Sequence, residues 1–153
     1  MSYEVIRDPL WNNIRIDPLA LRLVDTRAFI VFSDVHWAKW GSGPLLTFQK
    51  SDGRLVGGCG LIWESRTHAT AGYLFGREFW GRGFASECMR AMVDFARAER
   101  AMRVSAVCHV DNGASARVLE KAGLTLEGRL PNHIVFPNLS PDPQDVLSYG
   151  LTL

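Results

Sequence analysis

The sequence predicts a mixed α/β fold in one domain of 153 residues. Two patterns indicate this fold. Residues 45–76 hold short apolar runs separated by turn residues, which is typical of antiparallel strands. From Ala85 the apolar residues recur at helical spacing, and residues 103–110 then alternate as a strand does. Because a helix between two strands forms a crossover, we expect strands 70–76 and 103–110 to be parallel.

Composition narrows the class of protein. The chain is 47% hydrophobic, enough for a sizeable core, and its net charge of +1 gives no electrostatic case for nucleic acid or an anionic membrane as partner. Its three cysteines lie in apolar stretches without a Cys-x-x-Cys pair, so we expect free buried thiols and no metal site: Cys59, Cys88 and Cys108. No apolar run is long enough to span a membrane, so we expect the cytoplasm.

Residues 1–43 have the least regular pattern. Residues 19–24 alternate as a strand, and Asp25 is a suitable N-cap for a helix after it. We expect a short helix at residues 33–40 that packs its aromatic side chains on the sheet. The alternative is that His36, Trp37 or Trp40 lines a binding pocket.

The next segment predicts a three-stranded meander at residues 45–50, 54–63 and 70–76. Asp52-Gly53 is a strong hairpin signal between the first two strands. The small residues at 57–60 indicate either a close approach by a neighbour or a bulge.

The C-terminal half predicts a helix at residues 85–100, the parallel strand, and a short helix at residues 113–122. Asn112 is a good N-cap for the short helix, and Gly123 is a good residue to end it. Two further strands are expected at residues 124–130 and 145–153. The prolines between them predict that residues 132–144 form a loop, long enough to suspect a role in binding.

The segment Gly81-Arg82-Gly83, between a strand and a helix start, is the first candidate site. Its glycines free the backbone, and a helix N-terminus presents unpaired N–H groups and partial positive charge, an arrangement that binds phosphate. Arg82 is a candidate for an additional charge. The alternative is a plain connection in which the glycines serve packing. The pattern is neither the Walker loop nor the dinucleotide fingerprint.

Two motifs together resemble the GNAT superfamily of N-acetyltransferases. They are EFWGRGFASE at residues 78–87 and NGASARVLEKAGL at residues 112–124. The resemblance covers residues 44–153 and is closest to the branch that acetylates the N-terminal residue of ribosomal proteins. It implies a mixed sheet whose parallel strand pair separates at a bulge to admit acetyl-CoA. The cofactor-binding positions that it implies are Tyr73, Leu74, Phe75, Gly81, Arg82, Gly83, Phe84, Ala85, Ser86, Asn112 and Ser115.

The same resemblance suggests which residues act as general acid and general base. Many family members place a Tyr acid seven residues after the Asn, where this chain has Leu119. The ribosomal-protein branch places a Ser three residues after it, so Ser115 is the candidate acid or sulfur ligand. The usual base position holds Thr70, which leaves Glu64 as the next candidate base and His68 and His109 behind it.

A rival resemblance concerns residues 12–26, which look like the opening of HD-domain phosphohydrolases. Their metal chemistry needs a His-Asp pair, and no His of this chain is followed by Asp. We therefore expect an acetyl-CoA-dependent transfer of acetyl to a primary amine: a protein N-terminus, a small amine or an amino sugar. The alternative is a non-catalytic acyl-CoA sensor or interaction domain. An exposed edge strand makes a homodimer a further expectation.

Overall fold

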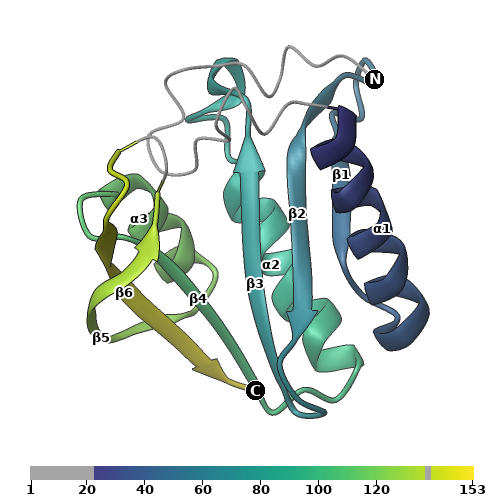
Figure 1. Cartoon of the computed structure of the whole chain (residues 1–153). Helices are drawn as coiled ribbons and strands as arrows, with labels where there is room; N and C mark the ends of the chain where they lie inside the picture. Colours follow the sequence, from purple (N-terminus) through teal and green to yellow (C-terminus); the bar gives the residue numbers. More distant parts are fainter. Residues whose placement is uncertain (1–22, 137–138) are drawn as a thin grey trace.

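The computed structural model describes residues 23–136 and 139–153. Within these ranges one six-stranded sheet has the strand order β1-β2-β3-β4-β6-β5, and three α-helices flank it (Figure 1). The elements are α1 (Leu23–Trp40), β1 (Pro44–Phe48), β2 (Leu55–Trp63), β3 (His68–Phe75), α2 (Phe84–Ala98), β4 (Arg103–His109), α3 (Gly113–Lys121), β5 (Thr125–Val135) and β6 (Pro143–Thr152). A 3-10 turn at Arg77–Phe79 links β3 to the glycine segment.

The parallel pair is the feature on which the site depends. β3 and β4 are parallel as predicted, but they pair only from His68↔Arg103 to Thr70↔Ser105. Beyond this point both strands continue and diverge (Figure 1). The divergence confirms the implied fold, whereas the implied bulge is wrong: β3 stays in unbroken register with β2, and β4 with β6.

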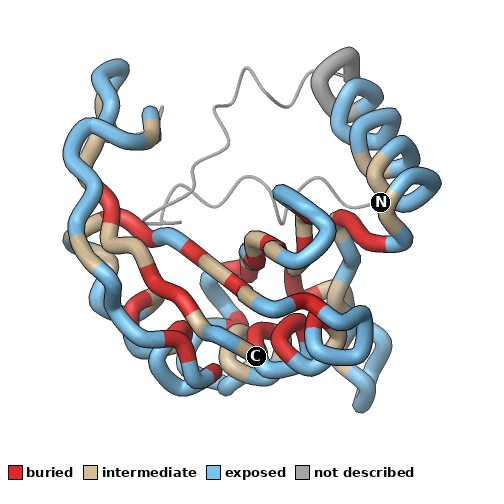
Figure 2. The backbone as a smooth tube through the Cα atoms, turned by 90° about the horizontal axis from the view of Figure 1, so that it is seen from below, coloured by how far each residue is buried: buried red, intermediate tan, exposed pale blue. Residues whose placement is uncertain are grey.

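The helices α2 and α3 pack against the sheet and form the main core with it. The predicted apolar stripe of α2 is buried at Met89, Met92, Val93 and Ala96. α2 contacts β2 and β3, while α3 lies beside α2 against β4 and β5. Figure 2 shows the buried positions gathered on the strands and on these two helices, with α1 largely exposed. None of the helices in the described ranges has the length and apolar character needed to span a bilayer.

The structure corrects two expectations about the ends of the chain. Helix α1 already begins at Leu23, so the expected strand at residues 19–24 is not formed where the structure describes it, and Asp25 lies inside the helix. Residues 12–22 lie outside the described residues. The expected loop at residues 132–144 is shorter than predicted at both ends, because β5 extends to Val135 and β6 starts at Pro143. Pro131 is tolerated because residues 131–133 are a break in the β5–β6 register.

Strand β2 contains both features that the sequence left open, a close approach at Gly57 and a bulge at the neighbouring Val56. A Cβ built on Gly57 would overlap the carbonyl oxygen of Leu74 and the ring of Phe75. Val56 is the extra residue of a bulge between β1 and β2, since Thr47 pairs with Gly57 and Phe48 pairs with Leu55. Close approach and a bulge therefore occur side by side.

Gly57→Ala is expected to lower the free energy of unfolding by about 1–3 kcal/mol, the usual cost of overpacking. Gly72→Ala is the matched control, because Gly72 is also in the sheet and a Cβ there meets nothing within 4 Å. Urea unfolding of both variants measures the difference. Equal stabilities of the two variants would show that β2 and β3 can move apart at no cost.

Candidate active site

The divergence of β3 and β4 opens a cavity of about 640 Å3. Its walls are the unpaired halves of the two strands, the start of α2, the cavity side of α3 and the end of β5. Of the predicted positions, ten line it: Tyr73, Leu74, Phe75, Gly81, Gly83, Phe84, Ala85, Ser86, Asn112 and Ser115. On the edge of Ala71 to Phe75 that faces β4, backbone groups have no β4 partner in the described chain. The Phe75 carbonyl accepts a hydrogen bond from Trp80 Nε1 at 2.9 Å, and the other groups of this edge are open to a ligand.

The glycine segment forms one wall and leads into α2. Gly81 and Gly83 have φ values of 71° and 89°, in the left-handed region that favours glycine. A Cβ at either glycine would meet nothing within 4 Å, so their backbone is open to a ligand. No side chain caps α2 at Gly83. The first N–H groups of α2 therefore have no side-chain partner at their N-terminus, and the helix dipole favours an anion there.

Arg82 does not add its charge to this wall in the structure. Its guanidinium donates a hydrogen bond to Gln49 Oε1 at 2.9 Å and lies 5.2 Å from the centre of the Phe84 ring. The side chain is therefore held toward the loop after β1, and Arg82 is not among the lining residues. Positive charge at the cavity comes instead from Arg117 and Lys121 of α3, which do line it.

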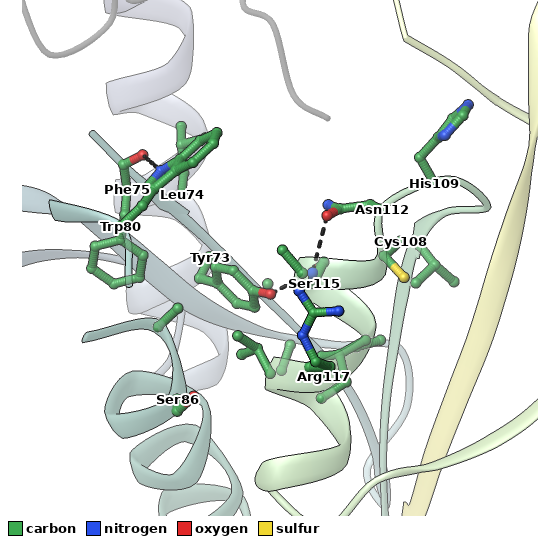
Figure 3. A pocket seen from close by; sticks show the side chains of 18 of the residues that line it. Tyr73, Leu74, Phe75, Trp80, Ser86, Cys108, His109, Asn112, Ser115 and Arg117 are labelled. Carbon is green, nitrogen blue, oxygen red and sulfur yellow. Dashed lines mark hydrogen bonds between the residues drawn. The ribbon is translucent and has the colours of Figure 1, made fainter. Parts of the chain in front are cut away.

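Hydrogen bonds link three residues across the cavity: one joins the side chains of Tyr73 and Ser115, and one joins the Ser115 backbone to the Asn112 side chain. The Tyr73 hydroxyl on β3 lies 2.6 Å from Ser115 Oγ on α3. Asn112 Oδ1 accepts the Ser115 N–H at 3.0 Å, which confirms the predicted N-cap. Figure 3 shows Tyr73 reaching across to Ser115, with Asn112 above the pair. Because the cap occupies Asn112 Oδ1, its amide nitrogen is the group left to donate to a ligand.

The surroundings keep the Tyr73 proton in place. Burial is the main reason that the pKa of Tyr73 rises to about 12, although the hydrogen bond from Ser115 acts in the opposite direction. Burial likewise raises the pKa of the Cys108 thiol, which lies beside Ser115. At neutral pH the Tyr73 hydroxyl and the Cys108 thiol are both protonated. Tyr73 and its partner Ser115 can therefore donate a proton or a hydrogen bond into the cavity.

The candidate bases are spread over both ends of the sheet. Glu64 lies in the exposed turn after β2, where its N–H bonds the His68 carbonyl. His68 Nε2 is 2.7 Å from Ser105 Oγ, at the paired end of β3 and β4. Neither residue lines the cavity, nor does Thr70. This placement argues against Glu64 as a general base.

His109 is the candidate base that does line the cavity. It is buried, and its Nδ1 accepts the N–H of Asp111 at 3.1 Å. A neutral ring with Nδ1 as acceptor carries its proton on Nε2, so it is a donor in this tautomer. In Figure 3 its ring points away from the Tyr73–Ser115 pair.

The end of β5 is a wall that the sequence placed in a loop. Ile134, Val135 and Phe136 line the cavity. The break before them is held by Asp145, which accepts the N–H of Asn132 at 2.9 Å and Arg129 Nε at 2.7 Å. The loop length suggested a role in binding, but neither the hairpin nor these three residues follow from it. The contact of the Tyr73 hydroxyl with Ser115 was missed too, because the sequence assigned Tyr73 through its backbone alone.

Comparison with known proteins agrees with this geometry. The uncharacterized protein YkkB of Bacillus subtilis (strain 168) is 32% identical over 103 residues, which are 65% of this chain and 60% of that protein. The chain therefore spans less than two thirds of that relative. The structure of the self-immunity acetyltransferase MccE with acetyl-CoA and AMP matches with a TM-score of 0.82 at 19% identity, over 99% of this chain and 84% of that one. The structure of the RimL ribosomal L7/L12 acetyltransferase in complex with coenzyme A matches with a TM-score of 0.83 at 20% identity. The match covers 99% of this chain and 86% of that one.

A family model settles the class of protein. The model described as "Acetyltransferase (GNAT) domain" matches residues 6–125. Its match includes residues 12–26, so the resemblance to HD-domain phosphohydrolases has no support. It supports acetyl-CoA as the cosubstrate and the mixed sheet as a GNAT fold. The chain therefore belongs to the GNAT acetyltransferase family.

Proposed function

We propose that this chain transfers the acetyl group of acetyl-CoA to a primary amine by direct attack of the neutral amine. The observation that carries the proposal is that three features share one cavity: the open glycine segment, the unpaired edge of β3, and the Tyr73–Ser115 pair. Bound acetyl-CoA would supply an activated acetyl group as a thioester.

The residues present fit such a ligand. Backbone N–H groups of Gly81, Gly83 and the first turn of α2 would hold the pyrophosphate, and Arg117 and Lys121 would offer charge to the remaining phosphate. The free edge of Tyr73 to Phe75 would bind the pantetheine arm as a neighbouring strand does and polarise the thioester carbonyl through an N–H. The amide of Asn112 would donate to the same arm.

The Tyr73–Ser115 pair is proposed to donate a proton or a hydrogen bond to the leaving sulfur. A thiolate that forms in a partly buried cavity needs a proton or a hydrogen-bond donor. Ser115 would face the sulfur while Tyr73, protonated across the physiological range, donates to Ser115 or to the sulfur itself. Two hydroxyls thus take the place of the single Tyr that the Leu119 position lacks.

The cavity also favours an acceptor that loses its proton easily. Among the described residues no carboxylate lines it, and its one imidazole has Nδ1 occupied. An α-amino group, with a pKa near 7.7–8.0, is partly neutral at pH 7.5, whereas an alkyl amine such as lysine, near 10.4, is almost wholly charged. We therefore propose an α-amino group, as in a peptide N-terminus, as the preferred acceptor.

Calorimetric titration with acetyl-CoA followed by an amine panel tests the proposal. The panel has three amines: a lysine-free peptide with a free N-terminus, an N-acetylated version of this peptide with one lysine added, and spermidine. The readout is release of the free thiol. We expect binding, and fastest release with the free N-terminus. Failure to bind millimolar acetyl-CoA would contradict the whole proposal, while faster release with spermidine would contradict the acceptor class alone.

The alternative function is acyl-CoA binding without catalysis. The observation in its favour is that the predicted base Glu64 lies outside the cavity. Binding of acetyl-CoA together with no thiol release on any amine of the panel would establish it.

A further inference from the structure

Outside the cavity, two cysteines share one hydroxyl. Thr47 Oγ1 on β1 lies 3.7 Å from Cys59 Sγ on β2 and 3.6 Å from Cys88 Sγ on α2. Both cysteines are free and partly buried. They are 29 residues apart in the sequence, from Cys59 to Cys88, and the packing of α2 on β2 brings them together.

The surroundings shift the pKa values of the three cysteines differently. The hydrogen bond from the Cys88 thiol is the main reason that the pKa of Cys59 falls to about 7. The same bond and burial raise the pKa of Cys88, so Cys59 loses its proton more readily than Cys88 does. Burial raises the pKa of Cys108, which lies at the cavity and not in this cluster. Since the thiolate is the nucleophile, Cys59 is the candidate attacking sulfur and Cys88, beside the same Thr47 hydroxyl, the candidate resolving partner.

We propose that Cys59 and Cys88 are a peroxide-reactive dithiol that closes to an intramolecular disulfide. The Cys59 thiolate attacks one oxygen of hydrogen peroxide, the O–O bond breaks, and a sulfenic acid and hydroxide form. The Cys88 thiol then attacks the Cys59 sulfur, an S–S bond forms, and the sulfenic oxygen leaves as water with the thiol proton. In total two thiols are oxidised, and one peroxide is reduced to two waters.

The position of the pair gives the disulfide a structural consequence. Cys88 is in the second turn of α2, and the first turn of that helix lines the cavity at Phe84, Ala85 and Ser86. A bond from Cys88 to Cys59 would tie this end of α2 to β2. The inference does not depend on the proposed acetyl transfer.

The experiment treats the reduced full-length chain with hydrogen peroxide and counts thiols after denaturation. Of the three thiols per chain, we expect one to remain, with a mass loss of two hydrogens and full recovery under dithiothreitol. Peptide mapping without reduction should show a Cys59–Cys88 cross-link within one chain. Three remaining thiols, a cross-link to Cys108, or a disulfide between two chains would each overturn the proposal.

Three variants sharpen the result. The Cys108→Ala variant contains only the Cys59 and Cys88 thiols. Peroxide should remove both, as it does in the wild type, because Cys108 takes no part. Cys88→Ser, whose hydroxyl can still donate to Cys59, should stop at a Cys59 sulfenic acid that dimedone labels, and an unlabelled Cys59 would contradict its role as attacking sulfur. Thr47→Val keeps the shape but removes the shared hydroxyl, so the disulfide should form several-fold more slowly. An unchanged rate would overturn the role given to Thr47, and the wild-type mapping stands even where a variant does not fold.

Discussion

Gly81→Asp is expected to weaken acetyl-CoA binding by at least about 30-fold, because a carboxylate at this wall repels the pyrophosphate by about 2 kcal/mol or more at an effective dielectric near 20. Gly81 lines the cavity, and a side chain there meets no protein atom within 4 Å. The new carboxylate is therefore free to face the ligand. Aspartate also tolerates a positive φ better than most residues, so the loss would be one of binding and not of folding.

Gly53→Asp is the matched control for this prediction. Gly53 has the same φ of 71° and the same open surroundings, but it lies in the β1–β2 turn and does not line the cavity. Both variants should unfold at similar urea concentrations, and only Gly81→Asp should lose affinity by calorimetry. Equal affinities of the two variants would show that the glycine segment is a connection and that the phosphates lie elsewhere.

Local signals predicted the parts of the site that short segments determine. A left-handed glycine beside a helix start, and an Asn at an N-cap, each depend on a few neighbouring residues. The structure agrees at Gly81, Gly83 and Asn112. Crossover logic also predicted the parallel pair, since a helix between two strands leaves few topologies.

Long-range geometry was beyond the sequence for a physical reason. Tyr73 and Ser115 are 42 residues apart, and they meet because β3 and β4 separate after Thr70 and Ser105. No residue pattern in either strand marks that point. Arg82 shows the reverse case: it is adjacent in sequence to the glycines of the site, but its side chain bonds Gln49 and does not line the cavity.

The predicted helix at residues 33–40 lies within α1, but its earlier start at Leu23 was missed because the pattern there is ambiguous. In α1, Phe29, Ile30, Val31 and Phe32 form a continuous apolar run, all exposed in the described chain. Such a run has neither the period of an amphipathic helix nor that of a strand, so periodicity cannot decide between them. The prolines after residue 130 misled in a different way, because Pro131 lies at a break in the β5–β6 pairing that a hairpin can accommodate.

Tyr73→Phe is expected to lower kcat by about 100-fold, within the usual range for removing a positioned proton donor. Acetyl-CoA affinity should change little, because the backbone of β3 remains in place. Tyr149→Phe is the matched control: Tyr149 is buried and its hydroxyl bonds Glu120 Oε1 at 3.1 Å, yet it does not line the cavity. Similar losses of kcat in the two variants would contradict a specific role for the Tyr73 hydroxyl.

The pH dependence of kcat separates a proton donor from a mere spacer. Because the pKa of Tyr73 is raised to about 12, its hydroxyl stays protonated from pH 7 to pH 10, and kcat should not fall through this range on its account. The Ser115 hydrogen bond lowers that pKa, so Ser115→Ala should raise it further and leave the plateau in place while reducing its height. If the two hydroxyls act as one unit, the double variant should lose little more than either single variant. Two results together would mean that another group protonates the sulfur. They are a wild-type kcat that falls steeply as the pH rises from 7 to 10, and losses of kcat in the Tyr73 and Ser115 variants that add fully in the double variant.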